Sequence, residues 1–149
     1  MLRSLLVSAS LLLTSAAFAD ETPMLVKTTG GGYMHPDFYR STKCEIFVDK
    51  VVVTKSVAQS WQTREEKVLY TDRNALLQLS LKVEEASKAE LVTEGPMIMD
   101  APMTHWVAMH RGEEVLLKSV FSVLEGKPYE TRKGEAAHSL VYLLDGLCD

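Results

Sequence analysis

Apolar and polar residues alternate with a period of two along much of the chain, and such alternation predicts strands with one buried face. In the first half of the sequence, the candidate strands are 24–29, 44–48, 51–57 and 63–70. The polar pair Asp49-Lys50 separates the second run from the third. It allows either a hairpin or one long bent strand across 44–57.

The segment 74–90 fits two patterns. A period of two, typical of a strand, joins Leu77, Leu79, Leu81 and Val83, whereas a helical stripe joins Leu76, Leu79, Val83 and Ala86. Its length and its content of Leu, Lys, Glu and Ala favour a helix. Thr71 or Asp72 can cap the start of this helix, and Gly95-Pro96 ends the element.

The second half predicts an antiparallel hairpin from strands 103–110 and 115–124, with a turn between them. Residues 126–134 are expected to form a loop. Residues 135–148 predict a helix with one apolar stripe, formed by Ala137, Leu140, Val141, Leu144 and Leu147. The expected fold is α+β, with an antiparallel sheet of about five to six strands. A mid-chain helix and a C-terminal helix pack on one face of that sheet.

The N-terminus has the pattern of a secretory signal peptide. Arg3 precedes a short apolar run, and Ala17-Phe18-Ala19 matches a small-x-small cleavage site. We therefore predict a signal peptide over 1–19, cleavage near Ala19-Asp20, and a single α+β domain over 20–149. No later run approaches the roughly 20 apolar residues of a membrane anchor. The expected location is secreted or periplasmic, with a soluble mature chain.

Charge and cysteine content narrow the expectation further. Without residues 1–19 the chain has 15 basic and 20 acidic side chains, a formal net charge of about −5. It contains no basic run, so nucleic acid is not an expected partner. The two cysteines, Cys44 and Cys148, are expected to form a disulfide in an oxidising compartment. Closing a loop of about 100 residues stabilises a fold by roughly 4–5 kcal/mol.

The segment GPMIMDAPMTHW, residues 95–106, is rich in soft ligand atoms. Thioether and imidazole groups suit Cu(I), so periplasmic Cu(I) handling is the alternative function. Its candidate ligands are Met97, Met99, Met103 and His105. A strand would direct Met103 and His105 to one face and Trp106 to the other. Methionine also fills gaps in cores, and packing is the preferred interpretation, with no metal expected.

No catalytic signature is present in the sequence. The nucleophile, zinc and phosphate-loop motifs are missing, and the four histidines show no metal-ligand spacing. Adjacent glutamate pairs such as Glu65-Glu66 point apart and cannot act together. We therefore predict neither an enzyme nor a cofactor, and the expected partner is another protein. The candidate contact surface is a glycine- and aromatic-rich turn that includes Gly30, Gly31, Tyr33, His35, Phe38 and Tyr39.

The motifs KTTGGGY, DAPMTHWVAM and AAHSLVYLLDGLC, with a helix between the first two, resemble the emfourin-like inhibitors. The resemblance implies a small α+β domain that blocks thermolysin-type metalloproteases. The sequence therefore indicates an exported protein-binding domain. The resemblance adds protease inhibition as the narrower hypothesis.

Overall fold

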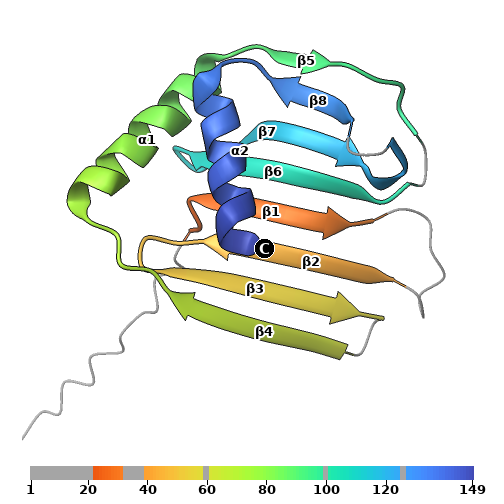
Figure 1. The fold of residues 1–149 in the computed structure, drawn as a ribbon, viewed down its shortest axis with the longest axis horizontal. Helices are drawn as coiled ribbons and strands as arrows, with labels where there is room; N and C mark the ends of the chain where they lie inside the picture. Colours follow the sequence, from red (N-terminus) through yellow and green to blue (C-terminus); the bar gives the residue numbers. More distant parts are fainter. Residues whose placement is uncertain (1–21, 32–38, 59–60, 99–100, 125–126) are drawn as a thin grey trace, which may run out of the picture.

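The computed structural model describes residues 22–31, 39–58, 61–98, 101–124 and 127–149, so the predicted signal peptide lies outside the described residues. Within these ranges the chain forms an eight-stranded antiparallel sheet and two α-helices (Figure 1). The strands of the first half are β1 (Leu25–Gly30), β2 (Arg40–Ile46), β3 (Lys50–Val57) and β4 (Trp61–Val68). Helix α1 (Arg73–Lys88) and strand β5 (Leu91–Thr93) follow. The second half comprises β6 (Met103–His110), β7 (Glu113–Phe121), the 3₁₀ helix η2 (Ser122–Leu124), β8 (Pro128–Arg132) and α2 (Glu135–Cys148).

The strands lie in the order β4-β3-β2-β1-β6-β7-β8-β5. The first four form a meander that runs outward from β1, and β6 to β8 run outward in the opposite direction (Figure 1). A helix follows each meander. The predicted α+β class is confirmed, but the predicted count of five to six strands is wrong.

Two short strands account for the difference. Strand β5 is only three residues long, and β8 lies inside the segment 126–134, for which the sequence predicts a loop. Strand β8 begins with a proline and has little apolar alternation, but it pairs with β7 on one side and β5 on the other. Its Arg132 donates to the carbonyl oxygens of Leu116 and Ala89, each at 2.7 Å. Pairing with strands on both sides, including the distant β5, therefore forms this strand against a weak local preference.

Both helix predictions are confirmed. The Asp72 carboxylate accepts a hydrogen bond from the Ala75 N–H at 2.7 Å, which caps α1. Helix α1 ends at Lys88, before the expected end of the element, because β5 follows it at once. Helix α2 covers the predicted range 135–148.

Tight turns join β2 to β3 and β6 to β7, so each of these strand pairs is a hairpin. The Phe47 N–H donates to the Lys50 carbonyl at 2.8 Å, so β2 and β3 form a hairpin and not one bent strand. Between β6 and β7, Arg111 and Gly112 have φ of 54° and 84°. Two successive positive φ values suit the right-handed twist of the flanking strands.

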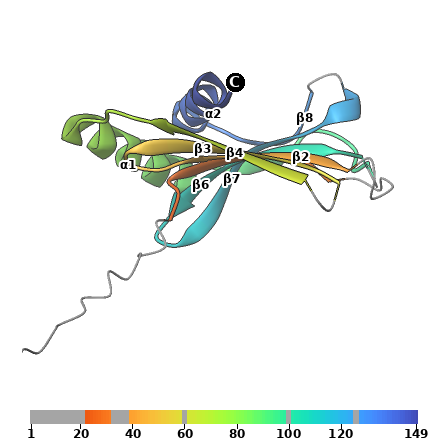
Figure 2. The same cartoon turned by 90° about the horizontal axis from the view of Figure 1, so that it is seen from below.

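One face of the sheet carries the hydrophobic core. Leu25 lies opposite Ile46 and Ala108 in the register, and all three side chains are buried. Residues of both helices join this core, namely Val83, Ala86, Ala136, Ala137, Leu140 and Leu144. Figure 2 shows α2 on one side of the sheet. No described helix covers the other side, which we call the open face.

Candidate functional site

The open face has an apolar centre. Val26 lies opposite Glu45 on one side and Val107 on the other, and Val107 lies opposite Leu116. Val26, Val107 and Leu116 are half-buried and line a depression of about 650 Å³ together with Pro23 and Met109. An antiparallel sheet that faces water usually carries polar side chains there, so this row departs from the ordinary pattern.

Charged and polar groups surround the apolar centre. On β2, the Lys43 ammonium pairs with the Glu45 carboxylate at 2.6 Å. On the opposite side, Glu114 and His105 line the depression, and neither has an ion pair among the described residues. The depression therefore has an apolar floor, and at its β7 side lies the Glu114 carboxylate, which has no ion pair in the described part of the chain.

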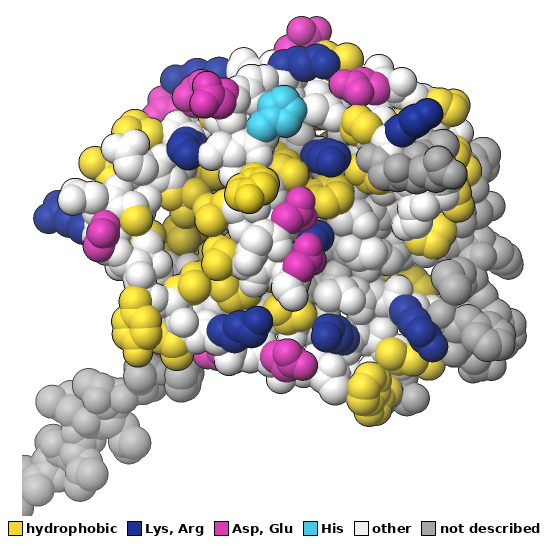
Figure 3. Space-filling model, viewed as in Figure 1, with side chains coloured by type: hydrophobic (Ala, Val, Ile, Leu, Met, Phe, Trp, Pro, Cys, Tyr) yellow, Lys and Arg dark blue, Asp and Glu magenta, His cyan; other side chains and the backbone are white. Residues whose placement is uncertain are grey.

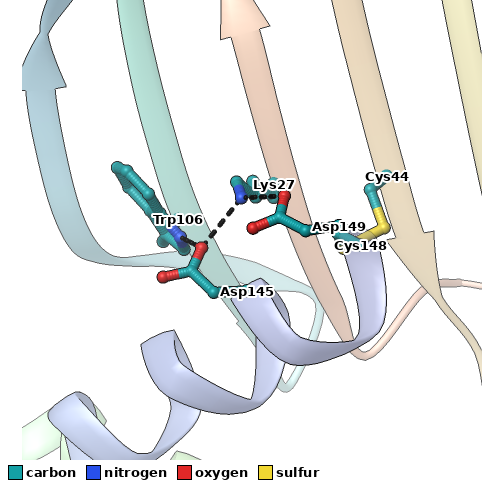
Figure 4. Close-up of a disulfide and its surroundings, with 6 residues drawn as sticks. All are labelled: Lys27, Cys44, Trp106, Asp145, Cys148 and Asp149. Atoms are coloured by element: carbon teal, nitrogen blue, oxygen red, sulfur yellow. Dashed lines mark hydrogen bonds and ion pairs between the residues drawn. A yellow bond between two sulfur atoms is a disulfide. The ribbon is translucent and has the colours of Figure 1, made fainter.

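The other face carries a polar cluster beside the predicted disulfide (Figure 4). Cys44 of β2 and Cys148 of α2 are bonded, with their Cα atoms 5.9 Å apart, so this prediction is confirmed. Lys27 Nζ lies 2.8 Å from Asp145 Oδ1 and 2.9 Å from Asp149 Oδ1. The Trp106 indole N–H donates to Asp145 Oδ1 at 2.8 Å.

These contacts hold the last turn of α2 against the centre of the sheet. Burial lowers the pKa of Lys27, but its hydrogen bonds and charge interactions with Asp145 and Asp149 outweigh that effect and raise the pKa. The ammonium is therefore charged and paired at neutral pH, and the Trp106 side chain is buried. A cluster whose donors and acceptors satisfy one another indicates a structural role.

A second apolar feature lies beside the first half of α1. A cleft of about 460 Å³ separates this helix from the ends of the strands, and its lining includes Met24, Val48, Leu76, Leu79 and Met109. Figure 3 shows hydrophobic side chains lining a hollow beside α1. The first half of this helix therefore stands partly away from the body of the protein.

The structure only partly places the candidate copper ligands. Met103 and His105 share the open face, and Trp106 points to the core face, as predicted. Met97 is 72% exposed, and Met99 lies outside the described residues. Among the described residues no three His, Cys, Asp or Glu side chains gather as a metal site would require. The Cu(I) hypothesis stays a prediction.

Most of the predicted contact turn also lies outside the described residues, including Tyr33, His35 and Phe38. Gly30 ends β1 with φ of 149°, and an added Cβ would lie 2.8 Å from the Ser41 Cβ. This glycine therefore allows β1 and β2 to approach closely, which is a structural role. Gly31 has φ of 86°, and Tyr39 is 37% exposed.

One group of side chains has the composition of a hydrolase triad without its geometry. His105 lies opposite Ser119 in the register, and Ser119 Oγ donates to Glu130 Oε2 at 3.2 Å. In a triad the carboxylate contacts the imidazole, and the serine is accessible to substrate. Here the carboxylate contacts the serine, and Ser119 is fully buried. The arrangement therefore does not activate a nucleophile.

Comparison with known protein families, curated proteins and solved structures finds no match. Within the described ranges, no helix is long and apolar enough to cross a membrane.

Proposed function

We propose that the chain is an exported protein-binding domain and that the depression on the open face is its contact surface. The supporting observation is the apolar row Val26, Val107 and Leu116 on a sheet face that no described helix covers. A contiguous apolar patch with a polar rim is typical of an interaction site. The predicted signal peptide supports export, and the disulfide is consistent with an oxidising compartment.

The charges of the rim favour one kind of partner. Lys43 is already neutralised by Glu45, whereas Glu114 has no ion pair in the described part of the chain. The best match is a polypeptide segment that places apolar side chains in the depression and a Lys or Arg near Glu114. Electrostatic matching of this kind selects partners more than it adds affinity.

Affinity capture with the mature, oxidised domain tests this proposal. The domain is immobilised and incubated with the exported fraction of its source. In the test variant, Val107→Thr and Leu116→Thr remove apolar surface and place threonine, a β-branched residue that suits strands, at both positions. The control variant Tyr142→Gln changes an 82% exposed side chain on α2, on the helical side.

We expect the wild type and the Tyr142→Gln variant to retain the same protein. The double variant should retain at least about tenfold less, because central apolar contacts contribute most of the energy of such interfaces. Far-UV circular dichroism checks that all three domains are folded. Equal capture by the double variant would refute the open face as the contact surface.

The narrower form of the proposal makes the partner a thermolysin-type metalloprotease. Its support is the resemblance of the sequence motifs to the emfourin-like inhibitors. The purified domain is added in excess to a panel of such proteases, and peptide hydrolysis is followed. Inhibition by the wild type that is lost in the double variant would support it. Full protease activity at hundredfold excess would remove this form and leave the broader proposal to the capture experiment.

A further inference from the structure

The first half of α1 leaves its leucines largely uncovered. Leu77 is 56% exposed and Leu81 is 50% exposed, while the buried residues of this helix are Val83 and Ala86, both in its second half. Figure 1 shows α1 diverging from α2 toward its N-terminal end. Leu77 and Leu81 are one turn apart and lie on the side of the helix away from the core. We call the surface formed by Leu77, Leu81 and their polar neighbours the leucine face.

We propose that the leucine face is a homodimer interface, in which the α1 helices of two copies pack antiparallel about a two-fold axis. With the axis midway between Leu77 and Leu81, each of these leucines lies opposite the other in the second copy. The four side chains then form one apolar centre. An isologous contact of this kind closes on itself and needs only one self-complementary surface.

Polar residues flank the leucines in a self-complementary arrangement. In an antiparallel pair about this axis, each flank of the helix meets the same flank of the second copy. Arg73 and Glu84 share a flank because they are about three turns apart. At about 1.5 Å rise per residue, Arg73 lies about 9 Å before the axis and Glu84 about 7.5 Å after it. Arg73 of each copy is therefore placed beside Glu84 of the other.

The opposite flank of α1 also places complementary polar groups beside each other. Asn74 and Glu85 have the same spacing, so the Asn74 amide of one copy lies beside the Glu85 carboxylate of the other. Arg73 and Glu85 have no ion pair among the described residues. Glu84 pairs with Lys88 through Oε1 at 2.8 Å, and no hydrogen bond to its Oε2 is found in the described part. These groups are available for contacts across the axis.

This complementarity favours a second copy over an unrelated partner. A face selected for a different protein has no reason to place opposite charges at positions that meet under its own two-fold rotation. The surface that one pair of 16-residue helices buries is smaller than the 1,200–2,000 Å² that stable interfaces typically bury. The dimer should therefore depend on protein concentration.

The inference goes beyond the proposed function and uses a different surface. Helix α1 lies on the helical side, so the pairing leaves the open face of each copy uncovered. The dimer would present two open faces to the partner. Simultaneous binding at both would raise the apparent affinity without any new contact.

Sedimentation velocity of the mature, oxidised domain from about 5 to 500 μM tests the proposal. The mean mass should rise toward twice that of one chain. The variant with Leu77→Gln and Leu81→Gln should remain monomeric over this range, and its exposed positions leave the fold intact. The open-face variant Val107→Thr/Leu116→Thr is the control and should dimerise like the wild type.

Charge reversal tests the predicted pairing. Arg73→Glu alone and Glu84→Arg alone should each weaken the dimer at least tenfold, because each places like charges across the axis. An equimolar mixture of the two variants should dimerise again, since both contacts between the different copies are then favourable.

A monomer at 500 μM, or a dimer that survives loss of both leucines, would overturn the proposal. Failure of the mixture to restore dimers would overturn the antiparallel register. If the domain is strictly monomeric but still captures a partner, the dimer proposal is wrong and the proposed function stands.

Discussion

Reduction of the Cys44–Cys148 disulfide should strongly destabilise the domain without unfolding it. The two cysteines are 104 residues apart in the sequence, and closing such a loop restricts the unfolded chain. The chain-entropy relation gives a stabilisation of about 4–5 kcal/mol for this length. For about 130 residues, the usual unfolding entropy converts this into a fall in Tm of about 15–20 °C.

The reduced domain should keep α2 in place at 20 °C. Leu140 and Leu144 remain fully buried against the sheet, and Lys27 and Trp106 still bind Asp145. These contacts do not depend on the sulfur–sulfur bond. Net stabilities of single domains are about 5–15 kcal/mol, so a loss of this size leaves a folded protein except at the lowest end of that range.

Urea denaturation of the oxidised and reduced wild type measures the effect, with circular dichroism as the readout. A Cys44→Ala/Cys148→Ala variant is the control, because its stability should not respond to the reductant. The reduced form should also show a larger m-value, since its unfolded chain is more expanded. A difference below about 1 kcal/mol between the two forms of the wild type would refute the loop-closure reasoning.

Two further predictions concern the β1 strand. Lys27→Met should cost about 1–2 kcal/mol by removing charged hydrogen bonds. Because the folded pKa of Lys27 is raised, its contribution is complete below about pH 10.4 and is lost as pH rises through the folded value. The gap between wild type and variant should therefore shrink from pH 8 to pH 11, and a constant gap would contradict the ion-pair explanation. Gly30→Ala should cost about 1–3 kcal/mol, because its Cβ would meet Ser41 at a positive φ. Gly146→Ala, with no atom within 4 Å, should be neutral or slightly stabilising in a helix, and equal losses would disprove the steric argument.

The sequence predicts the elements that bury an apolar face and misses those that pairing alone creates. Helix α2 has five apolar residues at helical spacing, and both of its bounds are correct. Strand β8 has no comparable pattern. It pairs with β5, which comes from a distant segment, and its register with β7 is irregular, so no local signal identifies it.

The ambiguity of α1 also has a physical cause. Leu77 and Leu81 on the outer side of the helix, together with Leu79 and Val83 on its inner side, place an apolar residue at every second position. This spacing imitates a strand. A pattern argument assumes that apolar residues point to one core. It fails where a second apolar surface is present.

The apolar centre of the open face has a sequence pattern that a search for alternation ignores. Adjacent apolar residues interrupt the alternation where strands are apolar on both faces, as in Leu25-Val26 and Leu116-Leu117. One residue of each pair enters the core and the other lies on the open face. The sequence alone could not show that the open face lacks a covering helix, because this depends on the side to which both helices fold.

Site-specific photo-crosslinking tests the proposed contact surface most directly. Benzoylphenylalanine is placed either at Leu116 on the open face or at Tyr142 on α2, and each domain is irradiated in the exported fraction of its source. We predict a crosslinked product of one defined mass from position 116 and none from position 142. A product from position 142 alone, or no product from position 116, would contradict binding through the open face.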